Sequence, residues 1–154
     1  MKRSVYICRK VVNSDDIKAW AQRQGFASCL PKGEMHVTVA FDHRKHDWRD
    51  LPLDAERTVD VIDPDERSVE LFRNGAVVLE IFSTPLTIRW AELVQAGLHW
   101  KYPDYRPHIT LTYNMPEGFD LSKIQPFDGK IELGPEITSS VIWNQRNHQD
   151  EDPL

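Results

Sequence analysis

His36-Val37-Thr38-Val39 and His108-Ile109-Thr110-Leu111 are two closely matching tetrads, each reading histidine, β-branched, threonine, apolar. Side chains on a β-strand alternate between the two faces of a sheet. A strand that carries either tetrad therefore places its histidine and threonine on one face and its apolar residues on the other. Two such strands together would build one polar site from two imidazoles and two hydroxyls. The rest of the chain is interpreted relative to this pair of strands.

Around the tetrads, the chain predicts an α+β fold with antiparallel sheet. Runs rich in β-branched and aromatic residues predict strands over 4–12, 35–41, 58–62, 68–73, 76–82, 107–113, 130–133 and 139–143. Helix-start signals follow Asn13, with a stop at Gly25, and Thr84 as N-cap opens a second helix that ends at Gly97. Residues 42–56 are dense in charge without a clear period, which favours a surface loop.

The two tetrads begin about half a chain apart, and each follows a strand and a helix. This weak internal echo predicts two similar lobes that face each other across a central cleft, with two antiparallel sheets and flanking helices. We expect residues 1–154 to form a single domain of two pseudo-symmetric lobes. The polar end, from about residue 145 to 154, is expected to be a flexible tail.

The composition is that of an ordinary soluble globular protein, with 40% hydrophobic and 28% charged residues. The formal net charge of −5 argues against binding to long nucleic acid. Cys8 and Cys29 form neither a C-x-x-C pair nor a disulfide framework, which favours reduced thiols in a cytoplasmic protein. No apolar run approaches the roughly 20 residues of a membrane-spanning helix, so we expect no membrane contact.

The residue types of the tetrads suit acid-base chemistry at a phosphodiester. An imidazole titrates near neutral pH, so one of His36 and His108 can be neutral as the base while the other is protonated as the acid. The hydroxyls of Thr38 and Thr110 can donate to phosphate oxygens, where negative charge builds during the reaction. Such a site needs no metal. One H-x-T strand alone is common by chance, so the evidence is the matched pair.

The twin tetrads resemble the signature of the two-histidine (2H) phosphoesterase superfamily, which is histidine-x-threonine/serine-x-apolar, twice. This resemblance implies the bilobal α+β fold and cleavage of phosphodiesters without a metal or other cofactor. In that superfamily the histidines are acid and base and the threonines hold the phosphate, so His36, His108, Thr38 and Thr110 inherit these roles. Members act on 2′,3′-cyclic phosphates, 2′,5′-linked oligonucleotides and related nucleotides.

The run WKYPDYRPHITLTY, at residues 100–113, resembles the second-motif region of the bacteriophage anti-CBASS nucleases. These enzymes degrade the cyclic di- and trinucleotide messengers, cyclic GMP-AMP among them, of a bacterial antiphage system. They cut a 3′-5′ bond with the adjacent ribose 2′-OH and leave a linear product ending in a 3′-phosphate. A glutamate on a late strand and an aromatic residue on a C-terminal lid also contribute there, which by position points to Glu136 and Trp143.

Three further residues are candidates for substrate contact, each with a structural alternative. Tyr6 on the first strand could stack on a base or be a core or rim tyrosine. Tyr105 is the best ligand candidate among the aromatic residues before the second tetrad, and its alternative is packing at the lobe junction. Arg106 could face the cleft and pair with phosphate or lie on the surface.

The leading hypothesis is a phage-encoded phosphodiesterase that acts in the host cytoplasm and cleaves cyclic oligonucleotide immune messengers. Its expected partner is the substrate itself, with no membrane, no long nucleic acid, no obligate protein partner, no cofactor and no metal. Two alternatives stay open. One is a 2H enzyme that acts on RNA 2′,3′-cyclic phosphates or 2′,5′-linked ends, and the other is a non-catalytic sponge that binds cyclic nucleotides in the same cleft.

Overall fold

The structure is a computed structural model, and it describes the chain except residues 27–28, 31–33, 55–59, 63–65 and 142–154. The described residues contain seven strands, which are β1 (Lys2–Val11), β2 (His36–Asp47), β3 (Asp60–Ile62), β4 (Arg67–Leu71), β5 (Val77–Ile81), β6 (His108–Thr112) and β7 (Ile131–Ser139). They also contain two α-helices, α1 (Ser14–Arg23) and α2 (Thr84–Gln95), and two short 3₁₀ turns, η2 (Trp48–Asp50) and η3 (Leu121–Lys123). None of these helices is long and apolar enough to cross a membrane.

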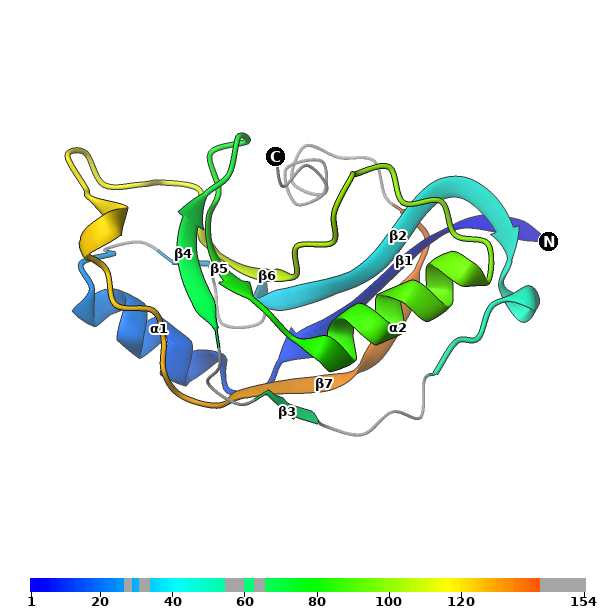
Figure 1. Cartoon of the computed structure of the whole chain (residues 1–154), viewed down its shortest axis with the longest axis horizontal. Coiled ribbons are helices and arrows are strands. Elements are labelled where there is room, and N and C mark those ends of the chain that lie inside the picture. The colour runs from blue at the N-terminus through cyan, green and yellow to red at the C-terminus, as the bar shows by residue number, and fades with distance from the viewer. Residues whose placement is uncertain (27–28, 31–33, 55–59, 63–65, 142–154) are drawn as a thin grey trace.

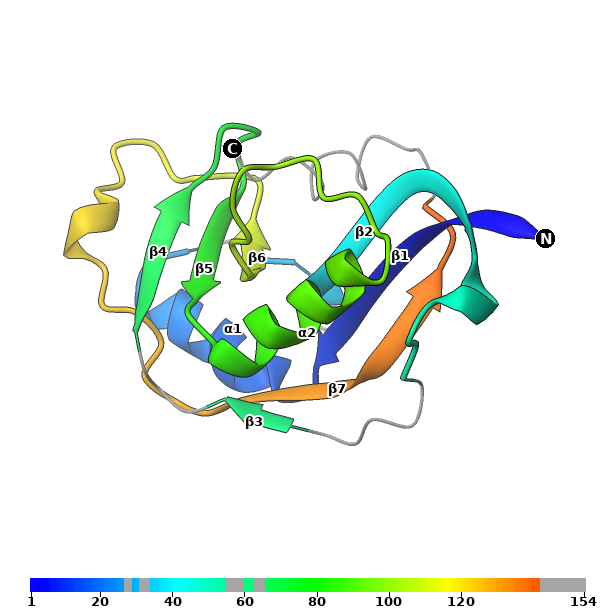
Figure 2. The same cartoon turned by 45° about the vertical axis from the view of Figure 1, so that its right-hand side comes forward.

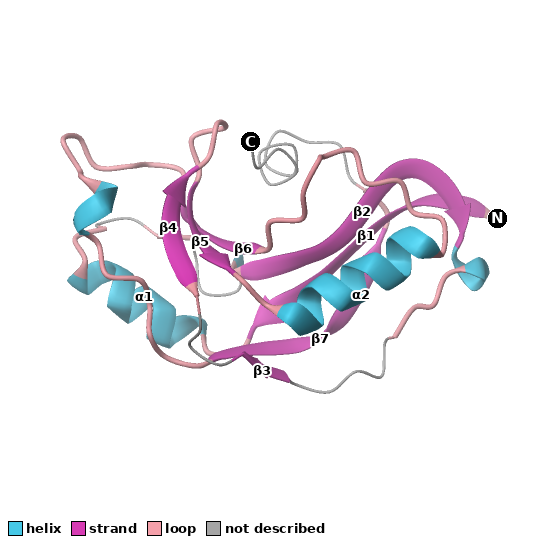
Figure 3. Cartoon of the chain, in the orientation of Figure 1, coloured by secondary structure: helices cyan, strands magenta, loops and turns pink. Residues whose placement is uncertain are grey.

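All seven strands belong to one curled antiparallel sheet in the order β3-β7-β1-β2-β6-β5-β4 (Figures 1 and 3). This differs from the expectation of two separate sheets. The two tetrad strands, β2 and β6, are neighbours at the centre of the order, so the halves on either side of them form one continuous sheet. Their contact is short, because Val37 opposite Ile109 is the register pair that joins them among the described residues.

One face of the sheet carries the hydrophobic core. Helix α1 packs there through Ile17 and Trp20 against a cluster that includes Val37 and Ile109. Helix α2 runs along β1 and β2 (Figure 2) and places Leu93 in a second cluster. That cluster also contains Val5, Ile7, Val39 and Ala40. The opposite face is left for the polar side chains of both tetrads.

Three predicted boundaries were wrong, for separate reasons. Strand β2 runs on to Asp47, because β1 pairs with it as far as Lys2 and backbone hydrogen bonds do not depend on side-chain polarity. The N-cap of α2 is Ser83, whose hydroxyl accepts from the Leu86 amide at 3.4 Å, so Thr84 is already helical.

The third correction concerns the end of the chain. Strand β7 (Ile131–Ser139) is one continuous strand across the interval between the two predicted segments, 130–133 and 139–143, and it ends at Ser139. Residues 142 and 143 of the second segment lie outside the described residues. Pro135 lies where the β1–β7 register shifts, between Val11↔Leu133 and Arg9↔Glu136, and a bulge tolerates a residue that cannot donate a ladder hydrogen bond. The buried guanidinium of Arg9 donates there to the carbonyls of Gly134 and Leu133, at 2.6 and 3.1 Å.

A buried ion pair fastens α2 to the sheet. Arg89 donates through Nε and Nη2 to the two oxygens of Glu136 on β7, at 2.8 and 2.9 Å, and Nη2 also donates to the Pro52 carbonyl. The two side chains are only 7% and 1% exposed. Removal of one partner would leave the other charge buried without compensation.

We therefore expect Arg89→Met to lower the free energy of unfolding by about 3–5 kcal/mol, measured by urea denaturation. The double variant Arg89→Met/Glu136→Leu should recover most of that loss, because it leaves no unpaired charge. Arg49→Met, which breaks the exposed Arg49–Asp47 pair, is the matched control and should unfold close to the parent. An unchanged urea midpoint for Arg89→Met would contradict this role for the pair.

Candidate functional site

The strand register brings the two tetrads together. Val37 and Ile109 face each other across β2 and β6 with side chains that are 0% exposed on the core face. Since the strands are antiparallel, one step along the register from this pair sets His36 beside Thr110, and one step the other way sets Thr38 beside His108. All four side chains share the face opposite the core. The two tetrads thus form a pseudo-symmetric set in which each histidine neighbours the other tetrad's threonine.

The two imidazoles have the same backbone anchor. Nδ1 of His36 lies 2.8 Å from the Glu34 carbonyl oxygen, and Nδ1 of His108 lies 2.8 Å from the Arg106 carbonyl oxygen. A carbonyl oxygen can only accept, so Nδ1 must carry the proton in both rings. In the neutral form of each ring, Nε2 then carries the basic lone pair. Either histidine can therefore accept a proton at Nε2, or donate one from it when the ring is protonated.

Tyr6 on β1 joins the first tetrad. Its hydroxyl lies 3.1 Å from Nε2 of His36 and 2.8 Å from Oγ1 of Thr38. The edge of its ring also faces the His36 ring, with 6.5 Å between centroids. The predicted substrate residue Tyr6 is thus in direct contact with two tetrad side chains. Its hydroxyl can relay a hydrogen bond between them, because a phenol both donates and accepts.

A bulge in β2 adds an aromatic wall to the site. The β1–β2 register shifts between Ile7↔Ala40 and Cys8↔Thr38, so Phe41 falls on the same face as Thr38 although three positions separate them. Strict alternation would have put Phe41 on the core face, which is why the sequence did not reveal it. A pocket of about 290 Å³ lies here, lined by Thr38, Phe41, Trp100, Tyr102, Tyr105, Arg106 and His108.

Tyr105 lies in this pocket, but its hydroxyl is already used. It donates to the Thr38 carbonyl oxygen at 2.9 Å, and its ring stacks on Trp90 with 5.2 Å between centroids and 3° between planes. Burial raises the pKa of Tyr105, and the charge of Glu136 raises it further, so the phenol keeps its proton. Tyr105 thereby ties the loop before the second tetrad to the strand of the first.

Arg106 lines the same pocket with a guanidinium that is already paired. Nε and Nη2 donate to the two carboxylate oxygens of Glu80 on β5, at 3.0 and 2.7 Å. The guanidinium also lies 4.7 Å from the centre of the Phe72 ring, and that ring packs edge-on against His108. Glu80 is directly opposite His108 in the β5–β6 register. This arrangement holds the His108 ring in place and leaves the arginine charge largely balanced.

Of the remaining two candidates, the structure describes Glu136. Its carboxylate is buried and accepts from Arg89 on α2, and its partner in the β1–β7 register is Arg9. A contact of Glu136 with substrate stays a prediction. Trp143 lies outside the described residues.

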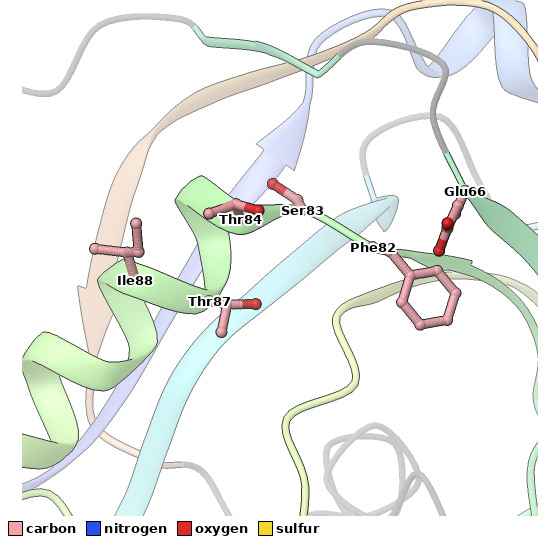
Figure 4. Close-up of a pocket in the computed structure, with 6 residues that line it drawn as sticks. All are labelled: Glu66, Phe82, Ser83, Thr84, Thr87 and Ile88. Atoms are coloured by element: carbon pink, nitrogen blue, oxygen red, sulfur yellow. The ribbon is translucent and has the colours of Figure 1, made fainter.

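A second, larger hollow of about 870 Å³ lies at the start of α2, lined by Glu66, Phe82, Ser83, Thr84, Thr87 and Ile88. Figure 4 shows Glu66 and Phe82 at one side and the α2 residues Thr84, Thr87 and Ile88 at the other. Neither tetrad reaches it. Its charged lining residue is a glutamate, which would repel a phosphate, so this hollow suits a phosphodiester poorly despite its size.

The chain is similar to known proteins over most of its length. The model of the family described as "Anti-CBASS protein Acb1" matches residues 3–148. A protein of that name from Caulobacter sp. (strain RHG1) is 35% identical over 145 residues, and one from Sphingomonas paeninsulae is 33% identical over 146 residues. These alignments cover 90% and 91% of this chain and 23% of each relative. The chain therefore spans about a quarter of the length of these curated relatives.

Solved structures share the fold at low sequence identity. E. coli LigT complexed with NADP+ superposes with a TM-score of 0.61 at 12% identity, and a structure described as a phosphoesterase superposes with a TM-score of 0.60 at 13% identity. Each alignment covers 94% of this chain and 91% of the other. The predicted 2H phosphoesterase-like fold is thereby confirmed.

The carbonyl anchors make a prediction that needs no substrate. Both His36 and His108 should show the Nδ1-protonated neutral tautomer above the pH at which they titrate, because Nδ1 faces an acceptor-only oxygen in each case. Two-bond ¹H–¹⁵N correlation spectra of the imidazoles report the tautomer directly. His99, which is exposed and whose ring has no carbonyl partner in the described part of the chain, serves as the internal reference. An Nε2-protonated ring at either position would contradict the proposed anchor.

Proposed function

We propose a function for this chain, which belongs to the anti-CBASS protein Acb1 family. It hydrolyses 3′-5′ bonds of cyclic di- and trinucleotide immune messengers and so counteracts CBASS defence. The observation that carries the proposal is the matched pair of imidazoles, each anchored at Nδ1 and each beside a threonine of the other tetrad. Two acid-base groups at one phosphodiester are what cleavage requires and what binding alone does not. The messengers are intracellular signals, so we expect the protein to act in the host cytoplasm.

The chemistry proceeds in two steps. In the first, Nε2 of one histidine takes the proton of a ribose 2′-OH, whose oxygen attacks the adjacent phosphorus. Nε2–H of the other histidine protonates the departing 5′ oxygen, so the ring opens and a 2′,3′-cyclic phosphate forms. In the second, the histidines exchange roles, water adds to phosphorus and the P–O2′ bond breaks. The product is a linear oligonucleotide that ends in a 3′-phosphate.

The threonines stabilise charge in both steps. The hydroxyls of Thr38 and Thr110 flank the histidines on the same face and can donate to the non-bridging oxygens as they gain negative charge. Acid, base and phosphate donors are all side chains in this scheme, so we propose that cleavage is independent of metal. Tyr6, through its contacts with His36 and Thr38, is the binding residue that we propose closest to the reacting phosphate.

The direct test is cleavage of cyclic GMP-AMP and cyclic tri-adenylate in EDTA, followed by chromatography. His36→Ala and His108→Ala should each lower the rate by about 10²–10⁴-fold, the usual value of a general acid or base. His99→Gln removes an exposed imidazole outside the tetrads and is the matched control. An active His36→Ala or His108→Ala enzyme would remove that residue from the mechanism.

The same assay separates the rival functions. Preferred cleavage of RNA with a 2′,3′-cyclic phosphate or a 2′,5′-linked end would identify an RNA-end enzyme instead. Tight binding of cyclic GMP-AMP with release of intact ligand would identify a sponge. Activity that appears only with added divalent metal would refute the metal-independent scheme.

The threonines give a separate prediction. Thr38→Val and Thr110→Val keep the shape of the side chain and remove the hydroxyl, so each should lower kcat by about 10²-fold, with a smaller effect on KM, if the hydroxyl acts mainly on the transition state. Thr112→Val is the control on the same strand, two residues past Thr110. A change in KM alone would mean that the hydroxyls bind substrate and transition state equally.

A further inference from the structure

A cyclic dinucleotide carries two phosphates, and the tetrads can serve only one of them at a time. The second phosphate bears a full negative charge and would be held best by a cationic side chain near the same pocket. This question rests on the proposed function, because it concerns the substrate class assigned there. The described residues near the site include both arginines and lysines. Their hydrogen-bond and ion-pair partners show which of them can bind a second phosphate.

The three arginines around the site already have hydrogen-bond or ion-pair partners. Arg106 forms a two-point pair with Glu80, and Arg89 forms one with Glu136 on the core face. Arg9 is buried on the core face, where it donates to backbone carbonyls. Binding of a phosphate by any of the three would require a carboxylate or carbonyl to give up its donor, and in the two ion pairs it would leave a buried charge unpaired.

Lys101 is placed differently. Its Nζ lies 5.7 Å from the centre of the Phe41 ring and 5.2 Å from the centre of the Tyr102 ring. Both rings line the pocket that also holds Thr38 and His108. The side chain is exposed, and it has no ion pair or hydrogen bond among the described residues. A weak cation–π contact keeps the ammonium beside two rings of the pocket without neutralising its charge.

The loop that carries Lys101 is itself fixed. Nε1 of Trp100 donates to the Asp104 carbonyl at 2.9 Å, which closes the loop on itself. The Trp100 ring packs edge-on against Phe41, with 5.2 Å between centroids, and against Tyr105, with 5.7 Å. Since Tyr105 is bonded to the Thr38 carbonyl, the loop keeps a set position relative to the first tetrad. A cation on such a loop is pre-organised for binding.

We propose that Lys101 binds the phosphate that is not being cleaved, and so makes the site prefer ligands with two or more phosphates. The first phosphate is met by the histidines and threonines on the sheet. Lys101 lies beside Phe41 and Tyr102, which line the same pocket as Thr38 and His108, so the rest of a cyclic ligand can extend toward it. Lys101 is thus a specificity residue, and no bond changes at it.

The test compares two ligands that share the scissile 3′-5′ bond. Cyclic di-adenylate has two phosphates, and the linear dinucleoside monophosphate ApA has one. Lys101→Gln should lower the ratio of kcat/KM for cyclic di-adenylate to that for ApA by about tenfold, the usual value of a hydrogen bond to a charged group. Lys101→Arg keeps the charge and should restore most of the ratio. Lys123→Gln removes one exposed charge from η3, which lines none of the pocket, and should leave the ratio unchanged.

Binding gives a second readout that does not depend on turnover. In the His108→Ala background, calorimetry should show that Lys101→Gln raises the Kd for cyclic di-adenylate about tenfold. If the protein cleaves cyclic di-adenylate but Lys101→Gln changes neither the kcat/KM ratio nor the Kd, the role of Lys101 is overturned. The proposed function then still stands. A protein that binds cyclic di-adenylate through Lys101 and cleaves none of cyclic di-adenylate, cyclic GMP-AMP and cyclic tri-adenylate would overturn the proposed function and support this inference. A protein that neither binds nor cleaves any of the three would overturn both.

Discussion

The contact between β2 and β6 is the constraint on which the rest of the structure depends. Val37 and Ile109 meet there, fully buried, and their opposition determines that His36, Thr38, His108 and Thr110 share one face. A slip of one residue in either strand would turn that strand's polar pair into the core. The helices, by filling the core behind this contact, hold the register. Stability and chemistry therefore rest on the same pair of strands.

Around that contact, the polar groups on the site face are held by backbone carbonyls and by one another. Glu34 and Arg106 carbonyls fix the two imidazoles, and the Thr38 carbonyl receives Tyr105. Such anchors fix each ring at Nδ1 and leave Nε2 for other contacts, which for His36 include the Tyr6 hydroxyl, and they need little reorganisation when a substrate binds. Arg9, Arg89 and Arg106 donate to carboxylates or backbone carbonyls, whereas Lys101 has no ion pair or hydrogen bond among the described residues.

Prediction from the sequence was most accurate where local pattern and tertiary role agree. The tetrad strands and the helix that begins near Asn13 follow from residue type and period. Prediction was wrong where partners far along the chain decide. β2 reaches Asp47 because β1 pairs with it, and β7 passes through Pro135 because a bulge at Arg9 accommodates it. The sequence also did not show that the Glu136 carboxylate pairs with Arg89, 47 residues away.

By itself, the sequence determined the reaction chemistry that the chain can support, because alternation along a strand is a local property and sets which side chains share a face. It determined the fold class for the same reason. Only the tertiary structure decided that the strands form one sheet, that Phe41 joins the site through the bulge after Thr38, and that Arg106 pairs with Glu80 while Lys101 has no ion pair among the described residues. These outcomes depend on register and on which charges meet, and both are properties of segments brought together from distant parts of the chain.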